Sequence, residues 1–426
     1  MRELDLSYTS IEDVPEGIER LVELRRLNIG NTRLRIIPNG KLSELRLLRS
    51  LVIPKTVEVA LKELVASKYL EDFDVGSFQV DDFNQFFRSL QVMNHRVYDI
   101  LLVPDLVVAN RYVRLSNLKY CAVLYKTRRT RRVMLYEIGL GGQSTEVLLP
   151  EDIEELEIDD CYDMGSCLSE TFLQSKLIHN KGLMNCTIEN CKGIKWILKL
   201  TSSSTAVPGG QVGGVVVDDE EGQISSCAPL QSLDSLRLTS LPDLIGLFEW
   251  ESAVAGAILP PHTFSSLKSL VIRDCPSLTK LFTSRLLLRH LQNLEEISIV
   301  ECGGLEEIII AEEESSDIYQ CSQLWTNNVV DISLSKLTEL NLRSLPNLRC
   351  IYKRRLICDS IERIVVESCS NLLRMPLSLP TIDGQLSPPP ALEEISLGKE
   401  EQGWWESLEW DNPHSRSVLQ PYVKFY

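Results

Sequence analysis

The residues with the greatest chemical potential are twelve cysteines and five histidines, since thiolates and imidazoles bind zinc and act in catalysis. Two thiol pairs stand close in the sequence: five residues separate Cys161 from Cys167, and four separate Cys186 from Cys191. Zinc sites favour thiols separated by two residues, and neither pair has that spacing. The pattern therefore favours packing, with metal binding as the alternative.

The histidines and the motifs of known enzyme classes give no catalytic arrangement. The histidines are His95, His179, His262, His290 and His414. Their spacing fits no metal-ligand pattern, and neither G-x-S-x-G nor H-E-x-x-H occurs. Gly139–Thr145 is similar to a phosphate-binding loop but lacks the Gly-Lys-Ser/Thr ending. We expect no catalytic residue, no metal and no cofactor, and hence no enzyme.

Two further groups of residues could bind ligands. The basic cluster Lys126–Arg132 would suit an anionic partner or a nuclear import signal, and a solvated loop is the alternative. Trp404, Trp405 and Trp410 could stack on sugars or bases. Because bulky amphipathic rings also cover apolar surface well, we expect these tryptophans to close the C-terminal end of the core.

Size and charge limit the class of protein. The 426 residues exceed the ~250–300 at which one core usually stops growing, so the chain has several domains or a repeat array. Its 44 basic and 60 acidic residues give a net charge of −16, which makes nucleic acid an unfavourable partner. No apolar run approaches the ~20 residues of a membrane span. We expect reduced cysteines and a cytoplasmic protein, with the nucleus also open.

A repeating pattern of apolar residues predicts the architecture. Taking Leu156 as zero, apolar residues stand at offsets −3, 0, +2, +8 and +11, with a small or apolar residue at +5. At this composition, five apolar offsets match by chance at a given start with odds of roughly 0.016. The starts that match are Leu156, Cys186, Leu236, Leu270, Ile297, Leu340 and Ile364. Seven matches in succession indicate a genuine repeat.

A related pattern opens the chain. The short motifs Leu4-Asp-Leu, Leu27-Asn-Ile, Leu51-Val-Ile and Phe73-Asp-Val follow one another at intervals of 22 to 24 residues. This is the leucine-rich-repeat pattern, in which each coil contributes one short strand and an irregular return. We therefore predict an α/β leucine-rich-repeat solenoid: a curved horseshoe with short parallel strands on its concave face and an irregular convex side with insertions.

Five cysteines occupy the +5 position of the repeat, where the backbone bends just past the strand. They are Cys161, Cys191, Cys275, Cys302 and Cys369. A thiol can pack at such a bend and act as a weak hydrogen-bond donor. We interpret these five as structural repeat cysteines.

The repeat divides the chain into segments. We expect N-terminal repeats over 1–80, irregular repeats with the basic cluster over 81–150, cysteine-marked repeats over 151–200, a flexible insertion over 201–227, further cysteine-marked repeats with insertions over 228–398, and a Trp-rich cap over 399–426. The strand register is weakest between residues 81 and 150. Candidate strands there lie near Ile100–Leu102 and Tyr120–Val123.

The sequence resembles the C-terminal leucine-rich-repeat region of plant disease resistance proteins of the coiled-coil, nucleotide-binding, leucine-rich-repeat type. The motifs that carry the resemblance are Leu4–Pro15 (LDLSYTSIEDVP), Leu270–Leu278 (LVIRDCPSL), the LPxL variants at Leu241 and Leu345, and the closing WWESLEW from Trp404. No phosphate loop or coiled coil occurs, and the sequence begins in mid-repeat. We therefore expect a fragment or an isolated domain of such a receptor.

The resemblance implies that the chain recognises proteins: a pathogen effector or a guarded host protein, and the nucleotide-binding module of the same receptor. A free-standing substrate receptor or adaptor of the ubiquitin-ligase type is the alternative. On the repeat geometry, offsets −1, +1 and +3 face outward on the concave sheet. The partner-binding candidates there are Glu155, Glu157, Asp159, Glu189, Arg237, Arg273, Arg343 and Arg363.

Overall fold

A computed structural model gives the fold of the chain. It describes residues 1–59, 63–64, 67–77, 80–90, 97–105, 108–109, 130–140, 147–172, 182–200, 230–250, 262–310, 331–375, 377–382, 385–410 and 412–426. The candidate strand near 120–123, most of the basic cluster, the insertion at 201–227 and the acidic start of another insertion at 311–317 lie outside these residues.

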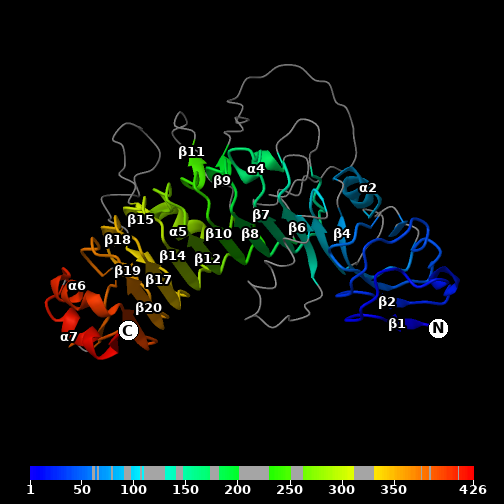
Figure 1. The fold of residues 1–426 in the computed structure, drawn as a ribbon. Helices are drawn as coiled ribbons and strands as arrows, with labels where there is room; N and C mark the ends of the chain where they lie inside the picture. Colours follow the sequence, from blue (N-terminus) through cyan, green and yellow to red (C-terminus); the bar gives the residue numbers. More distant parts are fainter. Residues whose placement is uncertain are drawn as a thin grey trace, which may run out of the picture.

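The main element is a curved sheet of fifteen parallel strands that lines the inner side of an arc, with the termini at opposite ends (Figure 1). In spatial order the strands are β1 (Glu3–Asp5), β2 (Arg26–Asn28), β3 (Ser50–Val52), β4 (Asp72–Ser77), β5 (Val97–Leu102), β6 (Arg131–Tyr136), β7 (Glu155–Asp159), β8 (Asn185–Glu189), β10 (Ser235–Thr239), β12 (Ser269–Arg273), β14 (Glu296–Val300), β17 (Glu339–Arg343), β20 (Arg363–Glu367), β23 (Glu394–Leu397) and β24 (Val423–Phe425). This is the predicted leucine-rich-repeat solenoid.

Shorter elements form the outer side of the arc (Figure 1). A three-stranded sheet consists of β13 (Phe282–Thr283), β15 (Glu307–Ile310) and β18 (Cys350–Tyr352). Two parallel pairs are β9 (Trp196–Leu200) with β11 (Gly246–Trp250) and β16 (Ile332–Ser333) with β19 (Leu356–Ile357). A hairpin is formed by β21 (Thr381–Ile382) and β22 (Gln385–Leu386). The helices are α2 (Val80–Leu90), α4 (Leu168–Thr171), α5 (Ser284–His290), α6 (Gln402–Ser407) and α7 (Ser415–Leu419), with 3-10 turns η1 (Ile18–Arg20), η3 (Lys399–Glu401) and η4 (Gln420–Tyr422).

The same turn ends the inner strand in each of the seven matching coils. The residue at offset +4 is left-handed, with φ between 51° and 59°, at Asp160, Asn190, Ser240, Asp274, Glu301, Ser344 and Ser368. In the first six coils its N–H donates to the +3 carbonyl of the next coil, for example from Ser240 to Arg273 at 2.9 Å. The turn therefore extends the ladder one bond beyond the strands and bends the chain toward the outer side.

The middle strands change the register of the sheet. Strands β1 to β3 have three residues, whereas β4, β5 and β6 have six each. The first apolar residue of each N-terminal motif pairs with its counterpart in the next coil, and this row ends with Phe73 paired to Tyr98. The corresponding row of the later coils starts two residues further along, with Ile100 paired to Val133 and Val133 to Leu156. The inward-facing pair is therefore displaced by two residues across these strands, which is why the period is weak there.

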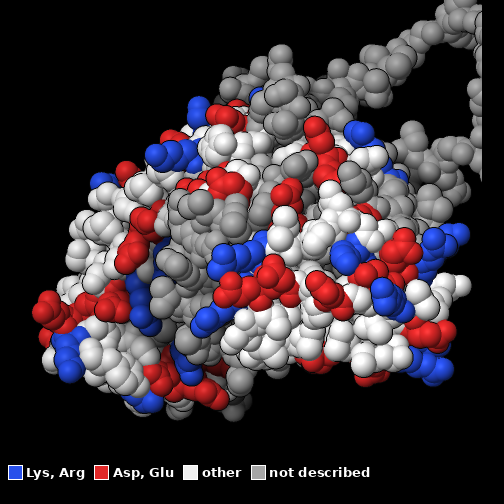
Figure 2. Space-filling view, turned by 45° about the vertical axis from the view of Figure 1, so that its right-hand side comes forward, with Lys and Arg blue, Asp and Glu red and all other residues white. Residues whose placement is uncertain are grey.

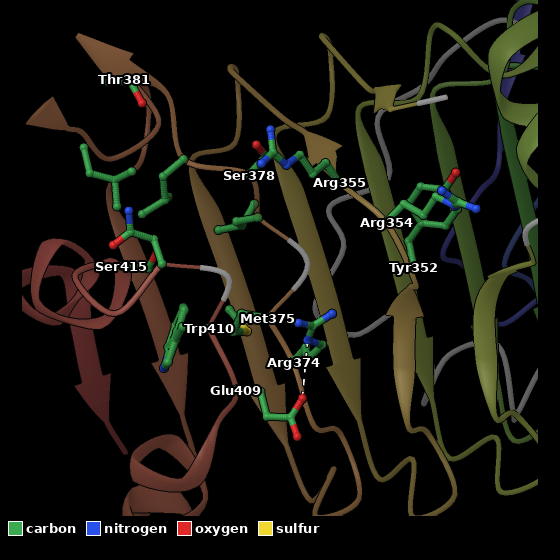
Figure 3. A pocket seen from close by; sticks show the side chains of 14 residues that line it. Tyr352, Arg354, Arg355, Arg374, Met375, Ser378, Thr381, Glu409, Trp410 and Ser415 are labelled. Carbon is green, nitrogen blue, oxygen red and sulfur yellow. Dashed lines mark ion pairs between the residues drawn. The ribbon is translucent and has the colours of Figure 1, made fainter. Parts of the chain in front are cut away.

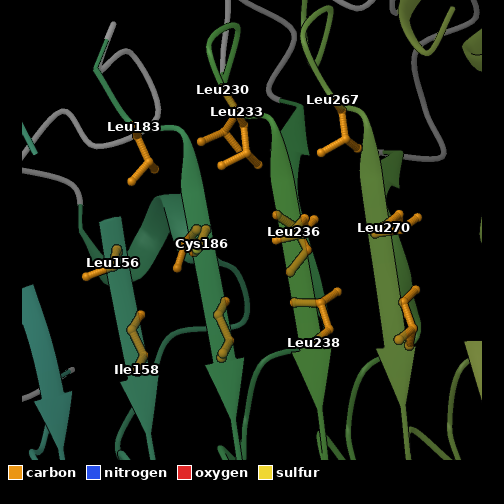
Figure 4. Close-up of a cluster of buried hydrophobic side chains, with 14 of the residues drawn as sticks. Leu156, Ile158, Leu183, Cys186, Leu230, Leu233, Leu236, Leu238, Leu267 and Leu270 are labelled. Atoms are coloured by element: carbon orange, nitrogen blue, oxygen red, sulfur yellow. The ribbon is translucent and has the colours of Figure 1, made fainter. Parts of the chain in front are cut away.

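The core lies between the inner sheet and the outer elements. The apolar positions of the template form rows across neighbouring coils, as Leu156, Cys186, Leu236 and Leu270 do in Figure 4. Each of these four side chains is at most 2% exposed. Each coil therefore covers the apolar face of the next, and the core is continuous along the solenoid from one end to the other.

At the C-terminal end, the tryptophans and a short strand complete the structure. Trp405 is 1% exposed, its indole N–H donates to Gln420 Oε1 at 2.9 Å, and its ring packs edge-to-face on Trp410 at 5.2 Å. Strand β24 pairs with β23 as the last strand of the sheet. The Ser368 N–H donates to the Glu401 carboxylate, whereas the +3 carbonyl of the next coil, at Gly398, accepts from the Glu401 N–H.

We predict that Trp405→Ala lowers the free energy of unfolding by about 3–5 kcal/mol, because it removes a fully buried ring and leaves a cavity. The measurement is urea unfolding followed by circular dichroism. Gln420→Ala is the matched control, and it should cost only about 1 kcal/mol because it removes the hydrogen bond alone. Equal losses in the two variants would contradict a packing role for the ring.

Candidate protein-binding surface

On the inner face of the sheet, the side chains at offsets −1, +1 and +3 of successive strands form three rows that face outward. The predicted arginines Arg237 on β10, Arg273 on β12, Arg343 on β17 and Arg363 on β20 are all exposed. Arg343 lies 3.6 Å from Glu367. In the described part of the chain, no carboxylate pairs with the other three arginines. These side chains are therefore available to a partner.

The side chains around these arginines are mostly small. Thr187, Thr239 and Val271 are half-buried on neighbouring strands, and Ser298 is buried. Small residues leave the backbone of the sheet close to solvent and leave room for a protruding partner segment. We call strands β8 to β20 with these arginines the C-terminal concave surface.

The predicted acidic group is less accessible than the sequence suggests. Glu155 and Glu157 are half-buried, and Asp159 is only 5% exposed. The Asp159 carboxylate accepts a hydrogen bond of 2.6 Å from Asn190 Nδ2 in the next coil. Glu189 is half-buried beside it. Asp159 therefore lies at an outward position, as predicted, but it is covered and is not exposed to a partner.

Arginines from the end of the predicted basic cluster neutralise this acidic group. The Arg132 guanidinium binds the Glu157 carboxylate and lies 3.9 Å from Glu155 Oε2. Arg131 binds Glu154 at 2.5 Å and Asp152 at 3.3 Å. Burial raises the pKa of Glu157, and the Arg132 charge opposes that rise. These two arginines hold the sheet together; they are not displayed for an anionic partner.

The chain covers the concave face of β5 and β6 itself. Leu101, Met134 and Tyr136 occupy outward positions there, yet they are at most 3% exposed. They form a separate apolar cluster with Val103, Val108 and Ala109. The signal in the sequence is the unbroken apolar runs ILLV and VMLY, which are typical of strands buried on both faces.

A half-buried ion cluster, not foreseen from the sequence, lies in the N-terminal coils. Lys55 Nζ lies 2.5 Å from Asp74 Oδ1 and 2.9 Å from Asp99 Oδ1, and it donates to the Asp99 carbonyl at 2.6 Å. Burial acts to raise the pKa of Asp99, but the charges of Lys55 and Arg132 outweigh it and lower that pKa. The cluster ties three coils together across β4 and β5.

The five repeat cysteines are buried, and each thiol lies within hydrogen-bonding reach of the carbonyl two residues earlier, at 3.0 to 3.5 Å. Burial raises the pKa of Cys191 to about 12 and that of Cys369 to about 11. A hydrogen bond from Cys275 lowers the pKa of Cys302. Protonated, buried thiols are poor nucleophiles and poor metal ligands, which supports the packing interpretation.

The face drawn in Figure 2 shows acidic and basic side chains interspersed, without segregation by sign. On the C-terminal concave surface the carboxylates of Glu296 and Glu339 share the sheet with the arginines. Such a mixed surface can orient a complementary protein through charge while small residues allow close approach.

We predict that Arg132→Gln lowers the free energy of unfolding by about 2–3 kcal/mol at pH 7.5, because it leaves the half-buried Glu157 carboxylate without its cation. The loss should shrink toward pH 5. Without Arg132 the folded-state pKa of Glu157 rises further above its ordinary value of 4.5. A carboxyl group whose pKa is raised by folding stabilises the folded state at pH values below its unfolded-state pKa, and this contribution is lost as pH rises through the folded-state pKa.

Urea unfolding at pH 5 and pH 7.5 checks this prediction. Asp99 and Glu155 also face Arg132, so the control must isolate Glu157. The double variant Arg132→Gln/Glu157→Gln should regain most of the stability lost at pH 7.5. A loss that is independent of pH and is not rescued would show that Arg132 acts mainly through its other neighbours.

The chain is similar to plant disease resistance proteins. The family model for "Plant disease resistance protein RPS2-like, leucine-rich repeats" matches residues 249–379. Disease resistance protein At4g27190 of Arabidopsis thaliana is 25% identical over alignments that cover 98% of this chain and 37% of that protein. Putative disease resistance protein At5g05400 of the same plant is 23% identical over 99% of this chain and 42% of that protein. The chain thus spans less than half the length of these relatives.

Solved structures also align with the chain. A leucine-rich-repeat protein from Leptospira interrogans is 14% identical, covers 100% of this chain and 95% of its own, and has a TM-score of 0.37. An internalin from Listeria monocytogenes is 12% identical, covers 88% and 79%, and has the same TM-score. None of the helices in the described residues has the length and apolar character that crossing a membrane requires.

The motifs of the repeat, the parallel inner sheet and the relatives that cover nearly the whole chain agree. The chain is therefore a leucine-rich-repeat solenoid, and its repeats are similar to those of plant disease resistance proteins.

Proposed function

We propose that the C-terminal concave surface recognises a protein, either a pathogen effector or a host protein that such an effector attacks. The observation that carries the proposal is the set of exposed arginines Arg237, Arg273 and Arg363, which no carboxylate of the described residues neutralises. Arginine is enriched at protein interfaces, where its guanidinium binds carboxylates through two parallel hydrogen bonds. The partner should therefore present an acidic surface.

The second part of the proposal concerns regulation. The relatives named disease resistance proteins are more than twice as long as the aligned region, and the resemblance stated above associates such repeats with a nucleotide-binding module. We propose that this chain acts on such a module and does so in the cytoplasm or nucleus, without enzymatic activity of its own. In this proposal the repeat region itself restrains the nucleotide-binding module.

The test is charge reversal on the concave surface. Arg237→Glu/Arg273→Glu should reduce capture of the specific partner from plant extract by about tenfold or more, because two attractive charge contacts become repulsive. The measurement is quantitative mass spectrometry of proteins retained by immobilised wild-type and variant chains at low and physiological salt.

Arg289→Glu is the control for charge alone, since Arg289 is an exposed arginine on α5 at the outer side. A partner should be retained by wild type and by this control, and lost from the concave variant. If both charge reversals change the same set of proteins by the same amount, the concave surface is not the recognition site.

A further inference from the structure

Between β10 and β17, unpaired arginines and glutamates occupy different rows of the C-terminal concave surface. Arg237 at offset +1 of β10 and Arg273 at offset +3 of β12 are exposed, and no carboxylate of the described residues forms an ion pair with them. Glu296 on β14 and Glu339 on β17 both stand at offset −1 and are half-buried. A cationic pair and an anionic pair thus lie on the same face, separated both along the strands and across them.

The anionic pair lacks a cation of its own. Glu296 and Glu339 are direct partners in the parallel register of β14 and β17, and at a strand spacing of ~4.8 Å their charges repel each other. Glu296 accepts a hydrogen bond of 2.6 Å from Ser269 Oγ, but neither carboxylate forms an ion pair within the described residues. Arg363, the register partner of Glu339 on β20, is exposed and joins neither. A cation from a partner would therefore relieve the repulsion.

Small side chains lie between the two charged pairs. Val271 on β12 is half-buried, and its register neighbour Ser298 on β14 is 7% exposed. The strands that carry them each have a parallel neighbour on both sides, so their backbone N–H and C=O groups are engaged in the ladder. A partner segment laid on this face can thus approach closely, but it meets backbone groups that are already bonded.

These conditions favour a helix over an extended segment. An extended segment would leave its own N–H and C=O groups without partners on such a ladder, whereas a helix bonds them internally. Spacings of ~4.8 Å between strands and ~3.3 Å along them place the cationic and anionic pairs about 15 Å apart. At ~1.5 Å per residue, that distance corresponds to roughly ten residues, or three turns, of helix.

We propose that the C-terminal concave surface binds an α-helix of the partner that has an acidic turn and a basic turn about three turns apart. The acidic turn meets Arg237 and Arg273. The basic turn meets Glu296 and Glu339, and small apolar side chains between the two turns contact Val271. This inference rests on the proposed function, and it adds a basic turn to the acidic partner expected there. An acidic N-terminal turn and a basic C-terminal turn also complement the helix dipole.

The probes are two synthetic peptides of about sixteen residues on an alanine background. In the first, glutamates occupy the N-terminal turn and lysines the C-terminal turn. The second has the same composition but carries both charges in each of these turns. A side-chain cross-link between positions i and i+4 holds both as helices. Fluorescence anisotropy measures their binding to the 426-residue chain at low and at physiological salt. The first peptide should bind saturably and at least about tenfold more tightly than the second.

Charge reversals in the chain give a sharper test. Glu296→Lys/Glu339→Lys should weaken binding of the first peptide by about tenfold, whereas an element that is only acidic would bind this variant more tightly. Arg237→Glu/Arg273→Glu should weaken it by a similar factor. The variant with all four changes should bind within about threefold of wild type, because the helix can bind end for end. Arg289→Glu on the outer side is the control and should leave binding unchanged, and circular dichroism checks each fold.

The inference is overturned if the first peptide shows no saturable binding, if the two peptides bind equally, or if the four-residue variant stays as weak as the double variants. The proposed function would survive each of these results, because it requires only that Arg237→Glu/Arg273→Glu loses the partner captured from extract. Unchanged capture by that variant would instead remove the proposed function, so the two failures are distinguishable.

Discussion

The turn that ends each inner strand is the contact on which the solenoid depends. A left-handed residue at offset +4 sends its N–H forward to the next coil, where it meets the +3 carbonyl at about the length of an ordinary ladder bond. Left-handed backbone geometry costs roughly 1–2 kcal/mol for a residue with a side chain. The hydrogen bond to the next coil and the burial of the +5 side chain together offset this cost. Each of the six coils from Leu156 to Leu340 is therefore bonded to the coil that follows it, and at Ser368 the Glu401 carboxylate takes the place of the +3 carbonyl.

This constraint also decides which side chains are free for function. Because the inward positions are committed to the core, only the outward rows can contact a partner. Along β5 and β6 even those rows are apolar and covered, and along β7 they are occupied by the Arg132 contacts. Toward the C-terminus, the accessible part of the concave face thus begins at β8, where the outward side chains become small or cationic.

Local spacing made the coils from residue 156 onward predictable, since every template position lies within one coil. The register across β4 to β6 was not predictable, because those strands are apolar on both faces and period-two alternation is lost. The Arg132–Glu157 pair depends on that register and joins residues 25 apart in sequence. A hollow lined by residues between Tyr352 and Ser415 (Figure 3) joins returns of unequal length, for which the repeat gives no rule.

The net charge of the chain says little about what approaches any one surface. At physiological salt the field of an exposed charge falls off over about 8 Å, which is less than two strand spacings of ~4.8 Å. A ligand at Arg273 therefore senses mainly the side chains of the adjoining coils. Because acidic groups elsewhere are screened, a chain with a net negative charge can still present a cationic site on its inner sheet.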